Sequence, residues 1–582
     1  MVAYSFIRTS SAALAGACFF FAVTATMAQD ARGRRELAEP VAAARASHGM
    51  VVAQETRAAQ LGRDVLARGG NAVDAAVATG FAMAVTYPRA GNLGGGGFMV
   101  IHLADGRDVA IDYRETAPAA ATREMFLGPD GRPDPAKSRD SALGVGVPGT
   151  VAGLVFAHEK YGSGRFTLAE LIAPAITLAR EGLPVEDDIA DTLPQWHRRL
   201  AKWAASAKIF SRPDGSSLQA GDRLVQTDLA DTLEAIAANG AKGFYEGPVA
   251  GKLAAAVRAA GGLITTDDLK SYRAVEREPV RGTYRGHAIV SMPQPSSGGV
   301  VLVETLNILE GFPLGTLGAG SVDTLHLMIE AMKRGYADRA RYLGDADFVA
   351  APLRQLLSKD VAAAKRKTID MAQATPWNDV QVTAPAVPRE GENTTHFSVM
   401  DTAGNAVSNT YTLNFSYGLG LVAEGTGVLL NNELDDFTAA PGAANAYGLV
   451  GFEANLPAPG KRPLSSMTPT IVLKNGRPVL VTGSPGGSRI ISATLQVIVN
   501  VLDFDMDIAT AVARPRLHHQ WLPDEVRVER GFSPDILDAL RARGHTIAQP
   551  LGQTSVNSIA AAPDGLYGGP DPRTRGATAA GY

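Results

Sequence analysis

Thr394 could become a catalytic nucleophile, because it stands in the run Asn-Thr-Thr-His-Phe-Ser at residues 393–398. A threonine hydroxyl is a weak nucleophile until a base removes its proton. The free α-amine of an N-terminal residue, with a pKa of about 7.7–8.0, is a base of suitable strength. Cleavage of the Asn393–Thr394 peptide bond would release this amine, and the Thr394 hydroxyl could make the cut by attacking the Asn393 carbonyl. The same residue would then act in maturation and, as nucleophile and base, in catalysis.

The residues that follow Thr394 extend this pattern. Ser-Val-Met-Asp-Thr-Ala-Gly-Asn-Ala-Val at 398–407 is followed by Thr-Tyr-Thr-Leu-Asn at 410–414. This stretch resembles the signature of the γ-glutamyltranspeptidases, which has a Thr-small-His-aromatic-Ser start, a Gly-Asn turn and a Thr-x-Thr-Leu-Asn strand. The resemblance extends from about residue 47 to residue 582. It implies an autoprocessed enzyme that cleaves glutathione and other γ-glutamyl compounds through a γ-glutamyl-threonine ester, and passes the group to water, an amino acid or a dipeptide.

A γ-glutamyl site needs a well-oriented nucleophile and donors for the oxyanion. The resemblance implies that Thr412 aligns the Thr394 hydroxyl, although Thr412 taken alone is an ordinary β-branched strand residue. Gly486 and Gly487, in Gly-Ser-Pro-Gly-Gly-Ser-Arg at 483–489, match the oxyanion loop of the family. Glycine lets backbone N–H groups approach the reacting oxygen closely. Taken alone, this run is a turn between a strand and a helix.

The substrate α-carboxylate needs a group of hydrogen-bond donors. Arg114, in Asp-Tyr-Arg-Glu-Thr at 112–116, matches the carboxylate-binding arginine of the family. A guanidinium suits this task because it can hold a carboxylate with two parallel hydrogen bonds. The alternative is a surface ion pair with Glu115. Ser465 and Ser466 match the hydroxyl donors to the same carboxylate, whereas a Ser-Ser pair taken alone is usually part of a loop.

The substrate α-ammonium needs acceptors. Glu433 and Asp436, in Asn-Asn-Glu-Leu-Asp-Asp-Phe at 431–437, match the family positions that bind it, with help from Asn414. Carboxylates in a partly closed site attract an ammonium far more strongly than they do in bulk water. Taken singly, such acids are most often solvated loop residues. Tyr447 matches a lid tyrosine that shields the acyl-enzyme from water in similar bacterial enzymes, but an exposed loop tyrosine needs no role.

Other motifs indicate structure and not chemistry. Gly-Val-Gly-Val-Pro-Gly at 144–149 fits a dinucleotide-binding pattern, but no strand precedes it and Pro148 lacks an N–H. We interpret it as a turn before a helix. His518 and His519 could suggest a metal, yet no His-Glu-x-x-His motif occurs. His396 is interpreted as a structural strand residue. We expect neither a metal nor a cofactor.

The elements that must position these residues follow from hydrophobic periodicity and turn signals. Helices are predicted at 55–67, at 73–85, through most of 150–269 and 300–343, and at 490–499. Strands are predicted at 98–101, 109–111, 396–400, 406–413, 427–430, 470–473 and 479–482. A Pro- and Asn-containing linker is predicted at 370–393. This pattern indicates only mixed helix and sheet (α+β). The resemblance implies the N-terminal nucleophile hydrolase fold, a four-layer αββα sandwich.

Composition and the N-terminus limit the class of protein. The chain has 582 residues, 46% of them hydrophobic, and a net charge of −4 without a long basic run, which argues against nucleic acid binding. Residues 1–28 resemble a secretory signal with an apolar stretch at 11–23, too short for the ~20 residues of a membrane span. The only cysteine, Cys18, lies within it. Lipid modification of Cys18 is disfavoured, because Ala15 stands where a leucine is expected.

The resulting hypothesis is a periplasmic or secreted γ-glutamyltransferase and glutathione hydrolase. Residues 29–393 would form the large subunit and 394–582 the small subunit of an obligate heterodimer that builds one catalytic domain. One alternative is an acylase of the same fold that acts on glutaryl or cephalosporin side chains. Another is a secreted binding protein with an inactive site.

Overall fold

Two antiparallel β-sheets form the centre of the computed structural model, which describes residues 42–380, 394–548, 550–552 and 554–582. Among these residues each sheet has seven strands. The first sheet contains, in spatial order, β1 (Ala44–Ala46), β20 (Gly565–Gly569), β19 (Ser558–Ala562), β15 (Arg477–Thr482), β14 (Thr470–Lys474), β9 (His287–Ser291) and β8 (Val280–Tyr284). The second contains β21 (Thr578–Gly581), β2 (Met50–Ala53), β10 (Thr395–Met400), β11 (Ala406–Thr412), β3 (Gly96–His102), β4 (Asp108–Tyr113) and β7 (Val275–Arg277).

The two sheets pack face to face over an apolar layer. Phe98 and Val100 of the second sheet and Val290, Ile471 and Ile559 of the first belong to one buried cluster. Phe98 and Val100 are two positions apart in β3, and alternate strand residues point to the same face of a sheet. The side chains between the sheets therefore hold them together as a sandwich.

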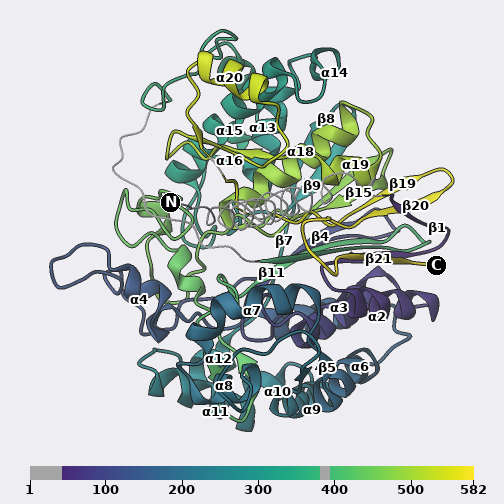
Figure 1. Cartoon of the computed structure of the whole chain (residues 1–582), viewed down its shortest axis with the longest axis vertical. Helices are drawn as coiled ribbons and strands as arrows, with labels where there is room; N and C mark the ends of the chain where they lie inside the picture. The colour runs from purple at the N-terminus through teal and green to yellow at the C-terminus, as the bar shows by residue number, and fades with distance from the viewer. Residues whose placement is uncertain (1–41, 381–393, 549, 553) are drawn as a thin grey trace, which may run out of the picture. The chain divides into compact units, whose positions relative to one another are not determined.

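Helices cover the outer face of each sheet, with the strands lying between two groups of helices (Figure 1). On the second sheet lie α2 (Thr56–Ala67), α3 (Ala72–Thr86) and α5 (Thr150–Tyr161). On the first sheet lie α13 (Gly298–Leu309) and α19 (Ile508–Ala513), with α18 (Ile490–Leu502) beside α13. Every residue of α3 is buried, which fits its almost entirely apolar sequence. The four-layer αββα fold that the sequence analysis inferred is confirmed.

Shorter elements surround these layers. The further helices are α4 (Pro135–Arg139), α6 (Leu168–Glu181), α7 (Asp187–Leu200), α8 (Ala204–Phe210), α9 (Thr227–Asn239), α10 (Lys242–Tyr245), α11 (Gly247–Ala259), α12 (Thr266–Ser271), α14 (Leu314–Leu317), α15 (Val322–Tyr342), α16 (Leu353–Leu356), α17 (Lys359–Arg366) and α20 (Pro534–Ala542). The short 3₁₀ helices are η1 (Ala142–Gly144), η2 (Glu433–Asp436), η3 (Glu453–Asn455) and η4 (Gly487–Arg489). The remaining strands are β5 (Leu183–Pro184), β6 (Arg223–Leu224), β12 (Val422–Ala423), β13 (Val428–Leu429), β16 (Leu517–His518), β17 (Val526–Val528) and β18 (Ile547–Ala548).

Most predicted elements are confirmed within one to three residues at their ends. The strands expected at 396–400 and 406–413 are β10 and β11, and the helix expected at 490–499 is α18. The turn predicted at 144–149 is also confirmed, since it leads directly into α5. The strand predicted at 427–430 is shorter, because β13 spans only two residues. The linker predicted at 370–393 is described only as far as residue 380.

Segments before and after residue 394 share both sheets. In the second sheet β10 pairs with β2 on one side and with β11 on the other, and β11 pairs in turn with β3. In the first sheet β14 pairs with β9. Each side of the proposed cut therefore contributes strands to the same hydrogen-bonded sheets, and the two parts build one sandwich.

The candidate nucleophile lies where several strands of the second sheet end. Thr394 immediately precedes β10, and Thr412 is the last residue of the neighbouring β11. Thr412 pairs with Gly96, the first residue of β3. Arg114 directly follows the last residue of β4, the next strand. The antiparallel order of the strands therefore places Thr394, Thr412 and Arg114 at the same end of neighbouring strands.

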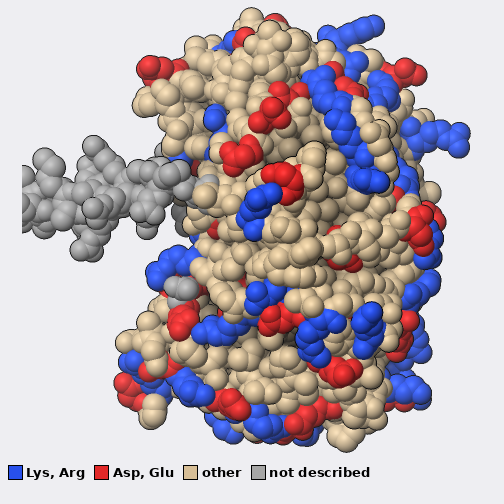
Figure 2. All heavy atoms as spheres, turned by 90° about the vertical axis from the view of Figure 1, so that its right-hand side faces the viewer, with Lys and Arg blue, Asp and Glu red and all other residues tan. Residues whose placement is uncertain are grey.

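The surface carries charges of both signs, and Figure 2 shows Lys and Arg mixed with Asp and Glu over most of one face. In the part of the chain that the structure describes, no helix is both long and apolar enough to cross a bilayer.

Three buried histidines give the fold an expected sensitivity to acid. Burial lowers the pKa of His396, His518 and His545 to about 3. In the unfolded chain a histidine titrates near 6.5, so below that pH the unfolded state binds protons that the folded state does not. Their contribution to stability is complete above about pH 6.5 and is lost as the pH falls towards 3. We expect the melting temperature to decrease steadily between pH 7 and pH 4.

Substitution separates this effect from general acid denaturation. His545→Asn should flatten the dependence of the melting temperature on pH, whereas the same change at the exposed His48 should not. Equal slopes for the two variants and the unaltered protein would contradict the assignment.

Candidate active site

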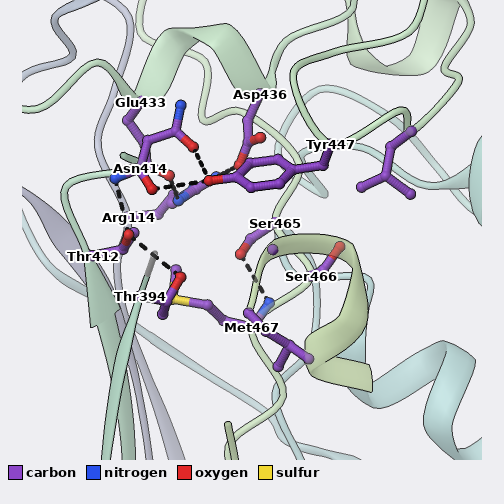
Figure 3. A pocket seen from close by; sticks show the side chains of 13 residues that line it. Arg114, Thr394, Thr412, Asn414, Glu433, Asp436, Tyr447, Ser465, Ser466 and Met467 are labelled. Atoms are coloured by element: carbon purple, nitrogen blue, oxygen red, sulfur yellow. Dashed lines mark hydrogen bonds and ion pairs between the residues drawn. The ribbon is translucent and has the colours of Figure 1, made fainter. Parts of the chain in front are cut away.

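The two threonines at the strand ends face each other. The Thr394 hydroxyl donates to the Thr412 hydroxyl oxygen over 3.5 Å (Figure 3). The Thr412 Oγ1 atom also accepts from the Asn414 backbone N–H at 2.9 Å, and the Thr412 carbonyl accepts from the side chain of Asn92 at 2.9 Å. Because the side chain and the carbonyl of Thr412 are both held, its hydroxyl is a fixed hydrogen-bond partner for Thr394.

A small cavity gathers most of the predicted site residues around Thr394. They come from segments that lie more than 300 residues apart, and three apolar side chains and Gly487 complete the wall. The lining residues are Arg114, Thr394, Thr412, Asn414, Glu433, Asp436, Tyr447, Leu449, Ser465, Ser466, Met467, Gly487 and Ile490.

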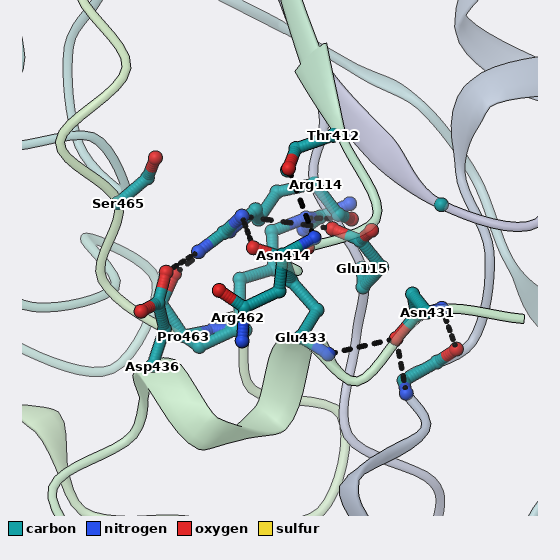
Figure 4. Close-up of polar contacts among 12 residues, drawn as sticks. Arg114, Glu115, Thr412, Asn414, Asn431, Glu433, Asp436, Arg462, Pro463 and Ser465 are labelled. Carbon is teal, nitrogen blue, oxygen red and sulfur yellow. Dashed lines mark hydrogen bonds and ion pairs between the residues drawn. The ribbon is translucent and has the colours of Figure 1, made fainter. Parts of the chain in front are cut away.

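Arg114 forms a buried ion cluster with the two predicted ammonium-binding acids (Figure 4). Its Nη1 atom donates to Glu433 Oε1, and its Nη2 atom donates to Asp436 Oδ2 at 2.6 Å. Its Nε atom donates to the Pro463 carbonyl at 3.2 Å. The Arg114 side chain has no exposed surface, and a buried charge is tolerated only when it is paired. The predicted carboxylate clamp and the predicted ammonium clamp are therefore in direct contact with each other.

Glu115 is a third acid close to Arg114, but it makes no hydrogen bond to the guanidinium. Its carboxylate is 3.8 Å from Arg114 Nη1, and among the described residues neither oxygen has a hydrogen-bond partner. Burial raises the pKa of both Glu115 and Glu433 above the usual value of a glutamate. The ion pair considered between Arg114 and Glu115 is present, but its expected position at the surface is wrong, because both side chains are fully buried.

Asp436 is held by residues that the sequence did not single out. Its Oδ1 atom accepts from the side chain of Asn445 at 2.9 Å, and its carbonyl accepts from the side chain of Asn455 at 2.7 Å. The neighbouring Asp435 instead accepts from Arg139 Nε at 3.3 Å and does not line the cavity. Of the two adjacent acids, only Asp436 faces the site.

Tyr447 covers the site. Its hydroxyl donates to Asn414 Oδ1, at 2.6 Å, and also lies 2.9 Å from the Asn414 carbonyl (Figure 3). The Tyr447 side chain is buried, and its ring packs edge-on against Phe415. Its backbone carbonyl accepts from the side chain of Gln520 at 3.1 Å. Hydrogen bonds therefore hold Tyr447 both at its side-chain hydroxyl and at its backbone carbonyl.

The predicted oxyanion loop lies under this ring. Gly486 and Gly487 have positive φ angles of 129° and 57°, and they lead through η4 into α18. A β-carbon on Gly487 would lie 2.2 Å from Tyr447 Cδ1, so glycine is required there for space as well as for conformation. N–H groups at the start of a helix carry a partial positive charge that suits an oxyanion.

Each of the two predicted serine hydroxyls accepts one hydrogen bond from a nearby N–H group. Ser465 Oγ accepts from the Met467 N–H at 3.0 Å, and Ser466 Oγ accepts from Arg339 Nη2 at 3.2 Å. Each hydroxyl keeps one hydrogen that it can donate. Arg339 was not identified from the sequence, because a single arginine within a helix has no distinguishing pattern.

Other predicted residues lie outside the cavity. Asn393 is outside the described residues, so the structure does not test the cleavage site. His396 lies 2.8 Å from Thr410 Oγ1 and 3.1 Å from Ser398 Oγ through its two ring nitrogens, which fits a structural role. His518 is similarly paired with Ser492. In residues 42–380 and the described part after 393, no group of three or more His, Cys, Asp or Glu side chains is arranged to hold a metal.

Comparison with known proteins decides the family. The model of the gamma-glutamyltranspeptidase family matches residues 58–581. The chain belongs to this family. It is 49% identical to the glutathione hydrolase proenzyme of Escherichia coli over the whole of both chains.

Solved structures agree with this placement. The cephalosporin acylase from Bacillus halodurans superposes with a TM-score of 0.82 at 30% identity, over 94% of this chain and 97% of that one. The gamma-glutamyltranspeptidase of Helicobacter pylori is 47% identical over 56% of this chain and 92% of the matched chain, with a TM-score of 0.54. The family and the N-terminal nucleophile hydrolase fold are thus established, and the acylase shows that other chemistry is known on the same fold.

The contact between Gly487 and Tyr447 can be tested by adding one methyl group. Gly487→Ala should push the Tyr447 ring away and disturb the oxyanion N–H groups, since the new carbon has no room. Loss of one such donor typically costs about 10²–10³ in kcat. We expect a decrease of roughly 100-fold in kcat/KM for a γ-glutamyl anilide.

Gly476→Ala is the matched control. Its φ angle of 75° imposes a similar backbone cost, but no atom lies within 4 Å of the added carbon. It should lower the melting temperature and leave kcat/KM unchanged. The same loss of activity in both variants would show that backbone strain, and not the Tyr447 contact, is responsible.

Proposed function

We propose that the chain is a γ-glutamyltransferase and glutathione hydrolase whose nucleophile is Thr394, freed by cleavage of the Asn393–Thr394 bond. The observation that carries this proposal is the cavity in which Thr394, hydrogen-bonded to Thr412, faces the ion cluster of Arg114 and its two acids. A nucleophile and a zwitterion-binding cluster in one cavity suit the two ends of a γ-glutamyl group. Membership of the gamma-glutamyltranspeptidase family supports the same reaction.

The reaction proceeds in two steps through an ester. The α-amine of Thr394 accepts the proton of its own hydroxyl, and the oxygen attacks the γ-glutamyl carbonyl. The N–H groups of Gly486 and Gly487 stabilise the oxyanion. The C–N bond of the substrate breaks, the amine leaves with the proton, and a γ-glutamyl ester remains on Thr394. Water or the amine of an amino acid or dipeptide then attacks the ester and restores the Thr394 hydroxyl.

Exchange of ion pairs explains recognition of the substrate. A γ-glutamyl group brings one carboxylate and one ammonium, so it can take the place of the contact between Arg114 and its two acids without leaving a charge unpaired. The carboxylate would bind Arg114, Ser465 and Ser466. The ammonium would bind Glu433 and Asp436, with Asn414 as a further acceptor. A glutaryl group lacks the ammonium and would leave these acids uncompensated, which disfavours the acylase alternative.

Tyr447 would act as a lid in this scheme. The ring lies over Gly487 and its hydroxyl is hydrogen-bonded to Asn414, so in this position it separates the nucleophile from bulk water. Opening of the loop would admit the substrate, and closure would protect the ester until an acceptor enters. A lid of this kind favours transfer to an amine over hydrolysis.

Maturation and location complete the proposal. Removal of residues 1–28 as a secretory signal and cleavage before Thr394 would leave residues 29–393 and 394–582 as an obligate heterodimer, periplasmic or secreted. The shared sheets support this, because the strands of the two parts are hydrogen-bonded neighbours. Neither a cofactor nor a metal enters the reaction as written.

Loss of the nucleophile should stop maturation and catalysis together. Thr394→Ala removes the hydroxyl that makes both attacks, so we expect a single uncut chain without activity. Mass spectrometry of the purified protein reads the masses of the chains and locates the cut. Thr394→Ser keeps a hydroxyl and should still be processed. Normal cleavage of the Thr394→Ala chain would show that another residue makes the cut.

Removal of one charge should reveal the ammonium-binding acid. Asp436→Asn keeps the size of the side chain but removes its charge. Hydrogen bonds to charged groups contribute about 1.5–3 kcal/mol, which corresponds to about 10- to 150-fold in kcat/KM for γ-glutamyl-p-nitroanilide. Glutaryl-p-nitroanilide has no ammonium, so its slower hydrolysis should not decrease further.

The neighbouring acid provides the control. Asp435 is bonded to Arg139 and does not face the cavity, so Asp435→Asn should leave the preference between the two anilides unchanged. A preference of the unaltered enzyme for the glutaryl compound would instead favour the acylase alternative.

A further inference from the structure

We infer that Arg339 is a positioning residue for the α-carboxylate of the substrate, which it serves by holding the Ser466 hydroxyl as a donor into the cavity and by adding a buried positive charge beside it. The inference rests on the proposed function, because it assigns a residue to the carboxylate end of the same site. Arg339 does not line the cavity that contains Thr394 and would not touch the substrate.

Arg339 projects from α15 towards the two serines of the site. Its side chain is almost completely buried. Its Nε atom donates to Ser297 Oγ at 2.9 Å, and its Nη2 atom donates to Ser466 Oγ at 3.2 Å. Ser297 Oγ in turn donates to the Ser465 carbonyl at 2.7 Å. One guanidinium therefore holds Ser466 directly and the backbone of Ser465 through Ser297.

The chemistry of arginine fixes the direction of these bonds. A guanidinium has five N–H donors and no acceptor, so Ser466 Oγ must accept from Arg339. The single hydroxyl hydrogen of Ser466 then remains to be donated elsewhere. Among the described residues none accepts it, and Ser466 lines the cavity. Ser465 is in the same position, because its Oγ accepts from the Met467 N–H. Each serine hydroxyl can therefore donate its hydrogen to an anion in the cavity.

Arg339 also adds a positive charge to the one that Arg114 provides. Arg114 is paired with Glu433 and Asp436, and in the proposed function the substrate takes over these contacts. Arg339 forms no salt bridge with any carboxylate that the structure describes, and its two hydrogen-bond partners are neutral hydroxyls. Burial lowers the pKa of Arg339 to about 10, so it keeps its charge at neutral pH. Asp436 interacts with Arg339 electrostatically without forming a salt bridge, and a substrate carboxylate at Ser466 would add a further counter-ion to this buried cation.

The position of Arg339 agrees with this role. It lines a second small cavity, whose wall shares Asp436 and Leu449 with the first. Asp436 lies close enough to both Arg114 and Arg339 to interact with their charges, and Arg339 adjoins the serines through Ser466.

The test compares two substrates that differ only in the carboxylate. γ-Glutamyl-p-nitroanilide carries it, whereas 4-aminobutyryl-p-nitroanilide keeps the amine and lacks the carboxylate. We expect Arg339→Met to raise the KM of the first by about tenfold or more, the size expected for one charge-assisted contact, with a smaller change in kcat. The kinetics of the second should not change. Arg339→Lys keeps the charge and one donor, so it should show a smaller increase on the first substrate only.

Controls separate positioning from a structural role. Arg341→Met changes an exposed arginine of the same helix and should affect neither substrate. If Arg339 acts through Ser466, the double variant Arg339→Met/Ser466→Ala should be no worse on the γ-glutamyl substrate than the more impaired single variant. If the Arg339→Met precursor is not cleaved, the two substrates are compared with the Arg339→Lys variant instead.

Three outcomes would overturn the inference. They are an equal loss on both substrates, no loss on either, and a change confined to the KM of an amino acid acceptor. Each leaves the proposed function intact provided that the unaltered enzyme cleaves the γ-glutamyl compound. Failure of the unaltered enzyme to cleave it would reject the proposed function itself.

Discussion

The pairing of Arg114 with Glu433 and Asp436 is the interaction around which the site is built. The arginine follows β4, and the two acids lie on η2, so the pair joins segments more than 300 residues apart in the chain. Charges without contact with water require such partners, and the pair therefore fixes η2 against the end of the second sheet. In the proposed function, the same need favours a zwitterion, since a ligand with both charges can replace these contacts.

This ion cluster is connected to the cover of the site. Asp436 accepts from the side chain of Asn445, and Asn445 Oδ1 accepts from the backbone N–H of Tyr447 at 3.0 Å. Asn445 therefore connects Asp436 with the backbone of the loop that carries Tyr447. Gln520 donates to the Tyr447 carbonyl. In the proposed function, a change at Asp436 would reach this loop through Asn445.

The sequence predicted most of the layout and much less of the contacts. The strands beside the nucleophile could be predicted from the alternation of residues along them. The site residues could be proposed from short motifs that resemble those of a known family. The contact of Arg114 with its two acids was not predictable, because those motifs indicate which groups bind a ligand and not which groups pair in its absence. Arg339 and Asn445 were missed for another reason. Arg339 acts through hydrogen bonds to Ser297 and Ser466, and Asn445 through hydrogen bonds within its loop and to Asp436; such contacts leave no recognisable sequence pattern.

The interleaving of the strands has a consequence for the lifetime of the mature protein. In the second sheet, β2 from before residue 394 lies between β21 and β10 from after it, and β11 pairs with β3. A precursor closes these ladders within one molecule, whereas two separated polypeptides would have to find each other again. Recovery after denaturation would then be second order in concentration and would compete with aggregation. Persistence of the heterodimer would therefore depend on the height of the barrier to unfolding, and not on an equilibrium that can be re-established.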